Sequence, residues 1–148
     1  MRRDVKSLNL IIKYCDDVAS DIARFGDDIE NLMGDESYQR STAKSIELIG
    51  ERAKRLSDDV TSRFKDVDWH EICKMRDFMA HQYEEVDLEF QWSTMKDDLP
   101  FLKQYCQRII AILESESDEE GIDPEPTPST DSTMNDVDPW AYSRAPSA

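Results

Sequence analysis

An arginine, a histidine and a tyrosine stand close together in the chain, at Arg76, His81 and Tyr83. An arginine can bind a phosphate through two parallel charge-assisted hydrogen bonds and can stabilise the added charge of a pentacoordinate phosphorus. A histidine titrates near neutral pH and can accept or donate a proton. Together these side chains suffice for metal-free RNA cleavage, in which the 2′-hydroxyl attacks its own phosphodiester and leaves a cyclic phosphate.

The helical stripe that contains Arg76 is otherwise apolar. At 100° per residue its members fall within roughly 80° of arc around the axis. They are Trp69, Ile72, Arg76, Met79 and Tyr83. A charge at such a position must be paired or face a cavity, because an isolated buried ion costs more than its packing returns. Arg76 could equally extend to solvent or form a structural ion pair with Glu47 or Glu51.

Helix geometry separates the histidine from the arginine. Around an ideal axis Tyr83 lies about 20° from Arg76, whereas His81 lies about 140° away. Either the helix ends before His81 and the backbone turns this residue back, or a second copy completes the site across a two-fold axis. A third interpretation needs no catalysis, since the helix dipole alone favours a histidine near a helix C-terminus.

Four long segments with apolar residues at spacings of three and four are predicted to form the helices that position this stretch. They are residues 4–25, a helix from Ser37 or Ser41 that ends between Leu56 and Phe64, Trp69 to His81, and residues 88–113, with a short helix at 29–33 after Gly26. Asp68 is the expected N-cap of the third, and Pro100 predicts a kink near residues 97–99 of the fourth. Gly50 and Ala53 permit close helix approach. We therefore predict an all-α, up-and-down bundle of four to five helices.

The composition changes abruptly after Leu113. Residues 1–113 are expected to form the bundle, whereas residues 114–148 are rich in acids, Ser, Thr and Pro and are predicted to be a disordered acidic tail. Trp140 and Tyr142 form an aromatic island that could bind a partner, although a solvated tail is the favoured interpretation.

The net charge of −15 argues against a polyanion as ligand, but the tail alone contributes −9. The body of the chain is therefore only mildly acidic, and it contains a locally basic segment. In this segment Arg40, Lys44, Arg52, Lys54 and Arg55 outnumber Glu47 and Glu51. The segment could face a polyanion or could be an ordinary solvated helix face.

The three cysteines, Cys15, Cys73 and Cys106, form no C-x-x-C pair and are expected to be free thiols, most simply as small buried residues. His70 and Cys73 have a spacing suited to two metal ligands, but no second pair is visible, so we expect no metal and no cofactor. The chain shows no long apolar run and begins with an amphipathic pattern, which predicts a cytoplasmic protein with no membrane partner.

The stretch from Trp69 to Tyr83, with Arg76-x-x-x-x-His81-x-Tyr83, resembles the HEPN superfamily and, more narrowly, the HepT-like toxins of toxin–antitoxin pairs. Three further segments resemble the same family. They are Ile-Gly-Glu at residues 49–51, Asp68-Trp69, and Asp98-Leu99-Pro100. The resemblance covers the bundle and not the tail.

This resemblance implies a helical homodimer that acts as a metal-independent endoribonuclease, with Arg76 and His81 as the catalytic pair. Asp77, which stands where the family commonly has Asn, and Glu51 would support the arginine. Tyr83 maps onto the tyrosine that a cognate MNT-type nucleotidyltransferase, the antitoxin, modifies with AMP from ATP, in a system of type VII or one like it. RNA and this antitoxin are the implied partners, and the homodimer could be part of a larger hetero-complex.

Two functions of other classes stay open. One is a non-catalytic HEPN bundle that serves as the binding partner of a nucleotidyltransferase, consistent with the acidic surface and with Asp77. The other is a helical scaffold whose tail recruits another protein, in which case deletion of residues 114–148 would abolish its function.

Overall fold

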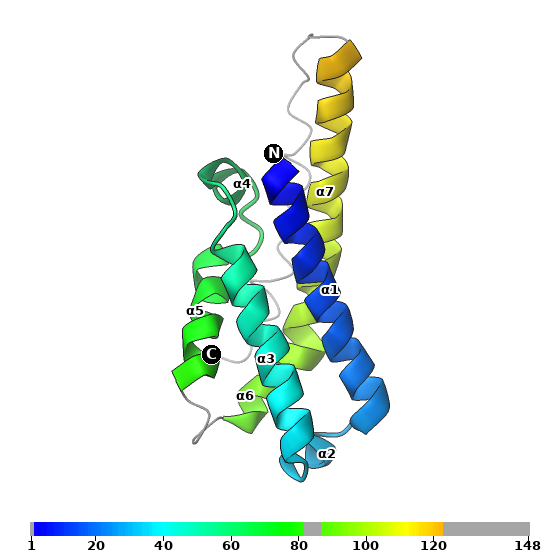
Figure 1. Ribbon diagram of the computed structural model, residues 1–148, viewed down its shortest axis with the longest axis vertical. Helices are drawn as coiled ribbons and strands as arrows, with labels where there is room; N and C mark the ends of the chain where they lie inside the picture. Colours follow the sequence, from blue (N-terminus) through cyan, green and yellow to red (C-terminus); the bar gives the residue numbers. More distant parts are fainter. Residues whose placement is uncertain (1, 82–86, 123–148) are drawn as a thin grey trace.

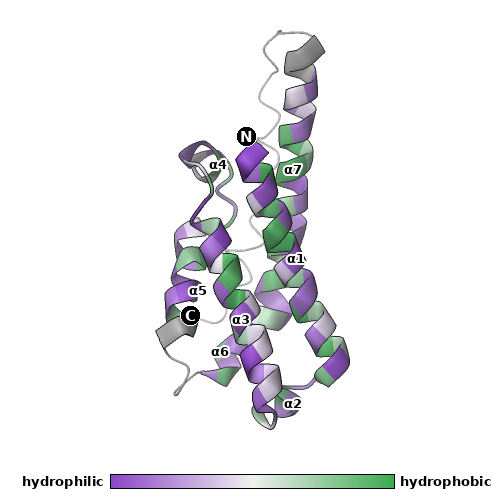
Figure 2. Ribbon diagram, viewed as in Figure 1, coloured by the Kyte–Doolittle hydropathy of each residue, from purple (hydrophilic) through white to green (hydrophobic). Residues whose placement is uncertain are grey.

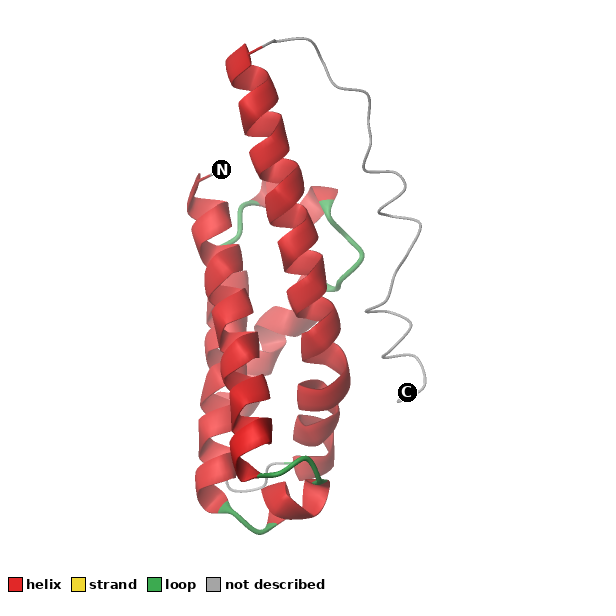
Figure 3. Ribbon diagram, turned by 90° about the vertical axis from the view of Figure 1, so that its right-hand side faces the viewer, coloured by secondary structure: helices red, strands yellow, loops and turns green. Residues whose placement is uncertain are grey.

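The computed structural model describes residues 2–81 and 87–122, and for residues 80, 81 and 119–122 it describes the backbone alone. The described elements are α1 (Arg2–Phe25), α2 (Ile29–Met33), α3 (Glu36–Ala53), α4 (Asp58–Arg63), α5 (Trp69–His81), α6 (Leu88–Ser93), a π-helical segment (Thr94–Asp98) and α7 (Leu99–Ile122). Figure 3 shows helices joined by short loops, and no strand occurs within these two ranges. The predicted all-α helical bundle is confirmed.

The four long helices run alternately up and down (Figure 1). Helix α3 packs between α1 and α5, and α1 packs against α7 on its other side. The short helices α2 and α6 lie together at the end where α3 begins, and α4 lies at the opposite end. The bundle therefore places α5 at one edge, where one of its faces contacts α3 and another side remains partly open.

The core is built from the apolar stripes predicted by periodicity. In Figure 2 hydrophobic and hydrophilic residues alternate around the long helices, as amphipathic helices require. Fully buried members come from α1, α3, α5 and α7; they include Leu8, Ile11, Ile46, Ile49, Ile72, Leu102 and Ile109. Trp69 of α5 stacks near Tyr105 of α7 with ring centroids 6.4 Å apart. None of the described helices is long and apolar enough to cross a membrane, and the cytoplasmic location stays a prediction.

Local capping fixes where several helices begin. Gly26, with φ of +124°, ends α1 as predicted, and its carbonyl accepts a hydrogen bond from Tyr38 Oη at 2.9 Å. Asp68 accepts a hydrogen bond from the backbone N–H of Glu71 at 3.2 Å, which confirms the predicted start of α5. Short polar side chains at helix starts satisfy backbone donors that have no partner within the helix.

The predicted end of the second long helix is wrong. Helix α3 ends at Ala53, and the apolar residues Val60 and Phe64 belong to a separate helix, α4, and to its C-cap. The cause is a contact with α1, because the backbone N–H and the hydroxyl of Ser57 both donate to the buried Asp4 carboxylate at 2.8 Å. Ser57 also caps α4, so it starts a new helix instead of continuing the previous one.

The predicted irregularity before Pro100 is present and takes the form of the π-helical segment. The backbone N–H of Leu99 bonds to the carbonyl of Thr94, five residues earlier. Proline lacks an N–H and clashes with the preceding turn, and such single-turn π segments accommodate a local disturbance within a helix. The predicted fourth helix is thus α6, the π segment and α7 in succession.

Helix α7 continues to Ile122, so the expected disorder of residues 114–122 is wrong. Leu113 is buried, and one turn later Glu116 forms a bidentate ion pair with Arg63 of α4, with Nη1 and Oε1 2.8 Å apart. This contact links the helix to α4 beyond the last buried apolar residue. Residues 123–148, including Trp140 and Tyr142, lie outside the described residues, and the division into bundle and tail stays a prediction.

Candidate active site

Helices α3 and α5 approach closely at Gly50 and Arg76. A Cβ atom on Gly50 would lie 2.8 Å from Arg76 Cβ, 2.9 Å from Arg76 N and 2.9 Å from the carbonyl oxygen of Ile72. Two of these neighbours are backbone atoms, which cannot move without moving α5. Glycine is therefore required at position 50, and it sets the distance between the two helices.

This contact explains how an arginine occupies an apolar stripe. Its neighbours in the stripe, Trp69, Ile72 and Met79, are buried. The first part of the Arg76 side chain packs against the backbone of α3, while the whole side chain remains 35% exposed. A long cationic side chain commonly buries its stem and keeps its charged end in water. Arg76 thus extends from the edge of the core to the surface.

Two carboxylates hold the guanidinium. Arg76 Nε lies 2.7 Å from Glu51 Oε1, and Arg76 Nη1 donates a hydrogen bond to Asp77 Oδ1 at 3.1 Å. The contact with Glu51 is an ion pair without hydrogen-bond alignment, since the buried Nε has no aligned acceptor among the described residues. Of the two acids considered from the sequence, Glu51 is therefore the partner, and Glu47 lies 3.9 Å from Lys44 instead.

Arg76, Glu51 and Asp77 form a trio of charged side chains, and the charge of this trio decides what it can bind. The hydrogen bond to Asp77, followed by the charge of Glu51, raises the pKa of Arg76 above its ordinary value, so the guanidinium stays protonated. Arg76 Nη2 makes no hydrogen bond with the part of the chain that the structure describes. Two carboxylates beside one guanidinium weaken its attraction for an anion.

The histidine is the last residue of α5. The backbone does not turn before His81, so the first of the two predicted ways to join His81 to Arg76 is wrong, and the helical separation of about 140° applies. The side chain of His81 and all of Tyr83 lie outside the described residues, and their roles stay predictions. Near this end of α5, Phe78 packs edge-on against Phe90 of α6, with centroids 5.2 Å apart.

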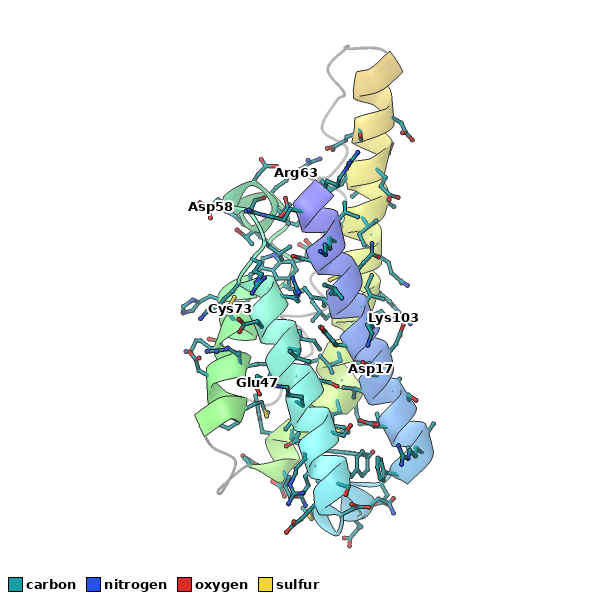
Figure 4. The ribbon with its side chains drawn as sticks, in the orientation of Figure 1. Asp17, Glu47, Asp58, Arg63, Cys73 and Lys103 are labelled. Carbon is teal, nitrogen blue, oxygen red and sulfur yellow. The ribbon has the colours of Figure 1, made fainter. Side chains whose placement is uncertain are left out.

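The cysteines are free thiols, as predicted, with Cys15 and Cys106 buried and Cys73 partly exposed. Burial raises the pKa of Cys73, opposed by the nearby charge of Lys54. No group of three or more His, Cys, Asp and Glu side chains within the described ranges is arranged to hold a metal ion. Figure 4 places Cys73 on α5, facing the side where α3 ends.

A groove of about 420 Å³ lies on another side of the bundle, between α1 and the start of α7. Its lining includes Cys15, Ile22, Met95 and Leu99, with Lys103 at 2.7 Å from Asp16. No residue of α3 or α5 lines this groove, and Figure 4 shows Lys103 and Asp17 away from Cys73 and Glu47. The groove is therefore separate from the arginine site.

The sequence identified Arg76, Asp77 and Glu51, and the structure brings these three together. It identified Gly50 only as a small residue that permits close approach, and missed that Gly50 faces Arg76 itself. A signal was available, because the glycine directly precedes the glutamate that pairs with the arginine. One short segment of α3 thus sets both the distance to α5 and the partner of its arginine.

The fold and the arginine site on α5 define a helical bundle of the HEPN superfamily. The chain belongs to the HepT-like ribonuclease family, whose model, described as ribonuclease HepT-like, matches residues 11–109. The family expected from the sequence is confirmed. The family match and the names of the relatives indicate ribonuclease activity of the HEPN type.

The chain is similar to several archaeal proteins. One from Methanocaldococcus jannaschii, named as a candidate RNase, is 30% identical over 114 residues, covering 76% of this chain and 97% of the relative. A second from the same organism with the same kind of name is 27% identical over 118 residues, covering 79% and 96%. A Thermococcus cleftensis protein named as a candidate ribonuclease HepT is 33% identical over 80 residues, covering 54% and 73%. No solved structure matches the chain.

Proposed function

We propose that the chain is the toxin of a toxin–antitoxin pair of type VII or one like it, and that it cleaves RNA without a metal ion. The observation that carries the proposal is the placement of Arg76. Its guanidinium lies at the surface beside α3, held at Nε by Glu51 and at Nη1 by Asp77, and Nη2 would bind a phosphate oxygen. In the HepT-like family this arginine opens the catalytic motif.

The site is completed by a second copy of the chain. Because α5 is helical through His81, the positions of Arg76 and His81 in one copy lie about 140° apart around the helix axis. A two-fold axis beside α5 would bring two arginines and two histidines into one cleft. The partly open side of α5 at the edge of the bundle leaves room for such a contact.

In this cleft the ribose 2′-oxygen attacks the adjacent phosphorus while a neutral His81 takes its proton. The bond from phosphorus to the 5′-oxygen breaks, and the leaving oxygen takes a proton from the second, protonated His81. The products are a 2′,3′-cyclic phosphate and a 5′-hydroxyl. Arg76 stabilises the charge on the phosphorane oxygens. DNA, which lacks the 2′-hydroxyl, is inert.

The test compares the two histidines of the chain. The purified full-length protein is expected to cleave RNA in EDTA, His81→Ala to lose cleavage by about a hundredfold or more, and His70→Ala, on the exposed first turn of α5, to keep it. A substrate with a single 2′-deoxyribose should resist cleavage at that position. If His81→Ala cleaves as fast as His70→Ala, the assignment of His81 is wrong.

The antitoxin would act on Tyr83. An MNT-type nucleotidyltransferase that transfers AMP from ATP to the hydroxyl oxygen of this tyrosine, with release of pyrophosphate, would place a bulky anion beside the cleft, where it competes with RNA phosphate. Incubation with the enzyme and ATP should add one AMP per chain, detected by mass spectrometry. Tyr83→Phe should stay unmodified and active, whereas Tyr14→Phe, on α1, should be modified like the natural chain.

A second function is favoured by the two carboxylates around Arg76. With a net negative charge on the trio, the chain could be a non-catalytic bundle that binds a nucleotidyltransferase. In this case Arg76→Ala would have no RNA cleavage to lose, and the complex with the nucleotidyltransferase would persist in size-exclusion chromatography. Cleavage that depends on Arg76 would exclude this function as the sole one.

A further inference from the structure

One end of the bundle gathers cations that have no acidic partner among the residues that the structure describes. At this end α1 begins, α3 ends, α4 lies beside them and the last turns of α7 extend past the start of α1 (Figure 1). No ion pair or hydrogen bond with another described residue engages the side chains of seven basic residues there. They are Arg2, Arg3 and Lys6 of α1, Arg52, Lys54 and Arg55 at the end of α3, and Lys65 after α4. We refer to these seven residues as the basic end.

Contacts between distant segments bring these cations together. Ser57, two residues after Arg55, is bound through its N–H and hydroxyl to Asp4 of α1 at 2.8 Å. This places Arg3 and the last residues of α3 at the same end. Lys54 is also close enough to Cys73 of α5 for its charge to act on the thiol. The basic end therefore joins parts of the chain some fifty residues apart.

The opposite end of the bundle carries the other sign. The segment of residues 26–35, which contains α2, holds four acids and no cation; they are Asp27, which is paired with Lys96 at 2.5 Å, Asp28, Glu30 and Asp35. The two other cations of the locally basic segment, Arg40 and Lys44, lie toward that end of α3 and are paired, with Glu36 at 2.8 Å and Glu47 at 3.9 Å. The seven cations of the basic end and the four acids of residues 26–35 thus lie at opposite ends of the bundle.

Stabilisation of the helices does not account for the basic end. Arg52, Lys54 and Arg55 at the C-terminus of α3 would be favoured by its dipole. Arg2, Arg3 and Lys6, however, lie in the first turns of α1, where the same dipole disfavours cations. The exposed acids described at this end are Asp58 and Asp59 in α4, Asp68 before α5, and Glu114 and Asp118 on the last turns of α7. A concentration of unpaired like charges is expected where a ligand neutralises them.

We propose that the basic end binds the phosphodiester backbone of the RNA substrate and leads the strand to Arg76. This inference rests on the proposed ribonuclease function. Lys54 follows Gly50 by one helical turn, about 6 Å along the axis, and Gly50 contacts Arg76 directly. The basic end thus begins beside the site and continues over the end of α3 to α1. Backbone contacts of this kind are independent of base sequence and depend strongly on salt.

The test uses full-length protein carrying His81→Ala, so that RNA binding is measured without cleavage. One variant adds Arg3→Gln, Lys6→Gln, Lys54→Gln and Arg55→Gln. A matched variant instead neutralises four cations elsewhere, with Lys13→Gln, Arg40→Gln, Lys44→Gln and Lys96→Gln, and so has the same net charge. Binding of a fluorescein-labelled single-stranded RNA is followed by fluorescence anisotropy across a series of salt concentrations.

The first variant should bind at least tenfold more weakly near about 100 mM salt, with a salt slope lower by about 0.7 for each lost phosphate contact. The matched variant should stay within about threefold of its parent. Equal weakening of both variants would overturn the proposal, because only net charge would then matter. The proposal would also be overturned if the first variant bound RNA as its parent does but no longer bound a nucleotidyltransferase, since the basic end would then be a protein-binding surface.

Two further arms separate this inference from the proposed function. Arg3→Lys, Lys6→Arg, Lys54→Arg and Arg55→Lys together keep the charge and should keep the affinity, which shows that binding depends on charge and not on the particular side chains. An unchanged urea midpoint of the Gln variant shows that its weaker binding is not a loss of fold. If RNA binding depends on the basic end but the protein that retains His81 does not cleave RNA in EDTA, the inference is upheld and the proposed function is overturned. If the protein that retains His81 cleaves dilute RNA equally fast with and without the four Gln changes, the proposed function is upheld and the inference is overturned.

Discussion

Gly50 and Arg76 are in contact across the interface of α3 and α5, and the absence of a side chain on one allows the other to reach the surface. A Cβ on Gly50 would lie 2.8 Å from the Cβ of Arg76. The next residue, Glu51, holds the guanidinium at 2.7 Å. The position of the arginine therefore depends on a helix other than its own.

Gly50→Ala is predicted to push α5 away from α3. Because two of the atoms that the new methyl would meet belong to the backbone, we expect a loss of about 1–3 kcal/mol in the free energy of unfolding, measured by urea denaturation, and a loss of cleavage. Gly34→Ala is the control, since a Cβ there would meet only the carbonyl oxygen of Glu30 at 3.4 Å. Equal stability of the two variants would contradict the contact.

Glu51→Gln is predicted to reduce RNA cleavage by about tenfold while changing the free energy of unfolding by less than about 1 kcal/mol, because an ion pair this exposed adds little stability. Cleavage falls because the guanidinium of Arg76 then has one carboxylate fewer to hold it in position. Glu47→Gln, one turn earlier on α3, removes a partner of Lys44 and should leave cleavage unchanged. In an Arg76→Ala background Glu51→Gln should have no further effect, and additive losses would argue against the coupling.

The three thiols are predicted to react in order of exposure. Near pH 8 iodoacetamide should label Cys73 first, because burial raises the pKa of Cys15 to about 12 and that of Cys106 well above its ordinary value, leaving few thiolates. Mass spectrometry of the labelled peptides gives the order. Labelling of Cys15 or Cys106 ahead of Cys73 in the folded protein would refute the packing described for α1 and α7.

The same burial predicts a loss of stability in alkali. Folding raises the pKa of Cys15 from 9.0 to about 12, so the folded state holds the proton more tightly than the unfolded state. This contribution is complete below the unfolded pKa and is lost as pH rises from 9.0 through about 12. Urea midpoints should fall over this range, and Cys15→Ala should reduce the dependence on pH, whereas Cys73→Ala should change it less.

Glu116→Gln is predicted to loosen the end of α7. Beyond Leu113 the described contact of this helix with the bundle is the bidentate pair between Arg63 and Glu116. Amides of residues 114–122 should exchange hydrogen faster in the variant, by about threefold for a loss of roughly 0.6 kcal/mol. The exposed neighbour Glu114 provides the control, and equal exchange in Glu114→Gln and Glu116→Gln would show that the pair does not anchor α7.

Much of the fold could be predicted because it is recorded locally. Helix periodicity located α1, α2, α5 and the combined α6 and α7, and Asp68 marked the start of α5. The errors have tertiary causes. Helix α3 stops early because Ser57 bonds to Asp4, and α7 extends further than expected, where Glu116 meets Arg63. Neither partner is near in sequence, so no local pattern could reveal them.

The sequence by itself determined the helical class, the family and the identity of Arg76 as the residue to explain, since periodicity and motif spacing are properties of a single segment. Only the tertiary structure decided that Gly50 faces this arginine, that Glu51 is its partner in place of Glu47, and that cations from α1 and α3 share one end of the bundle. These relations depend on how helices pack against one another, because packing brings together side chains that the chain itself keeps far apart.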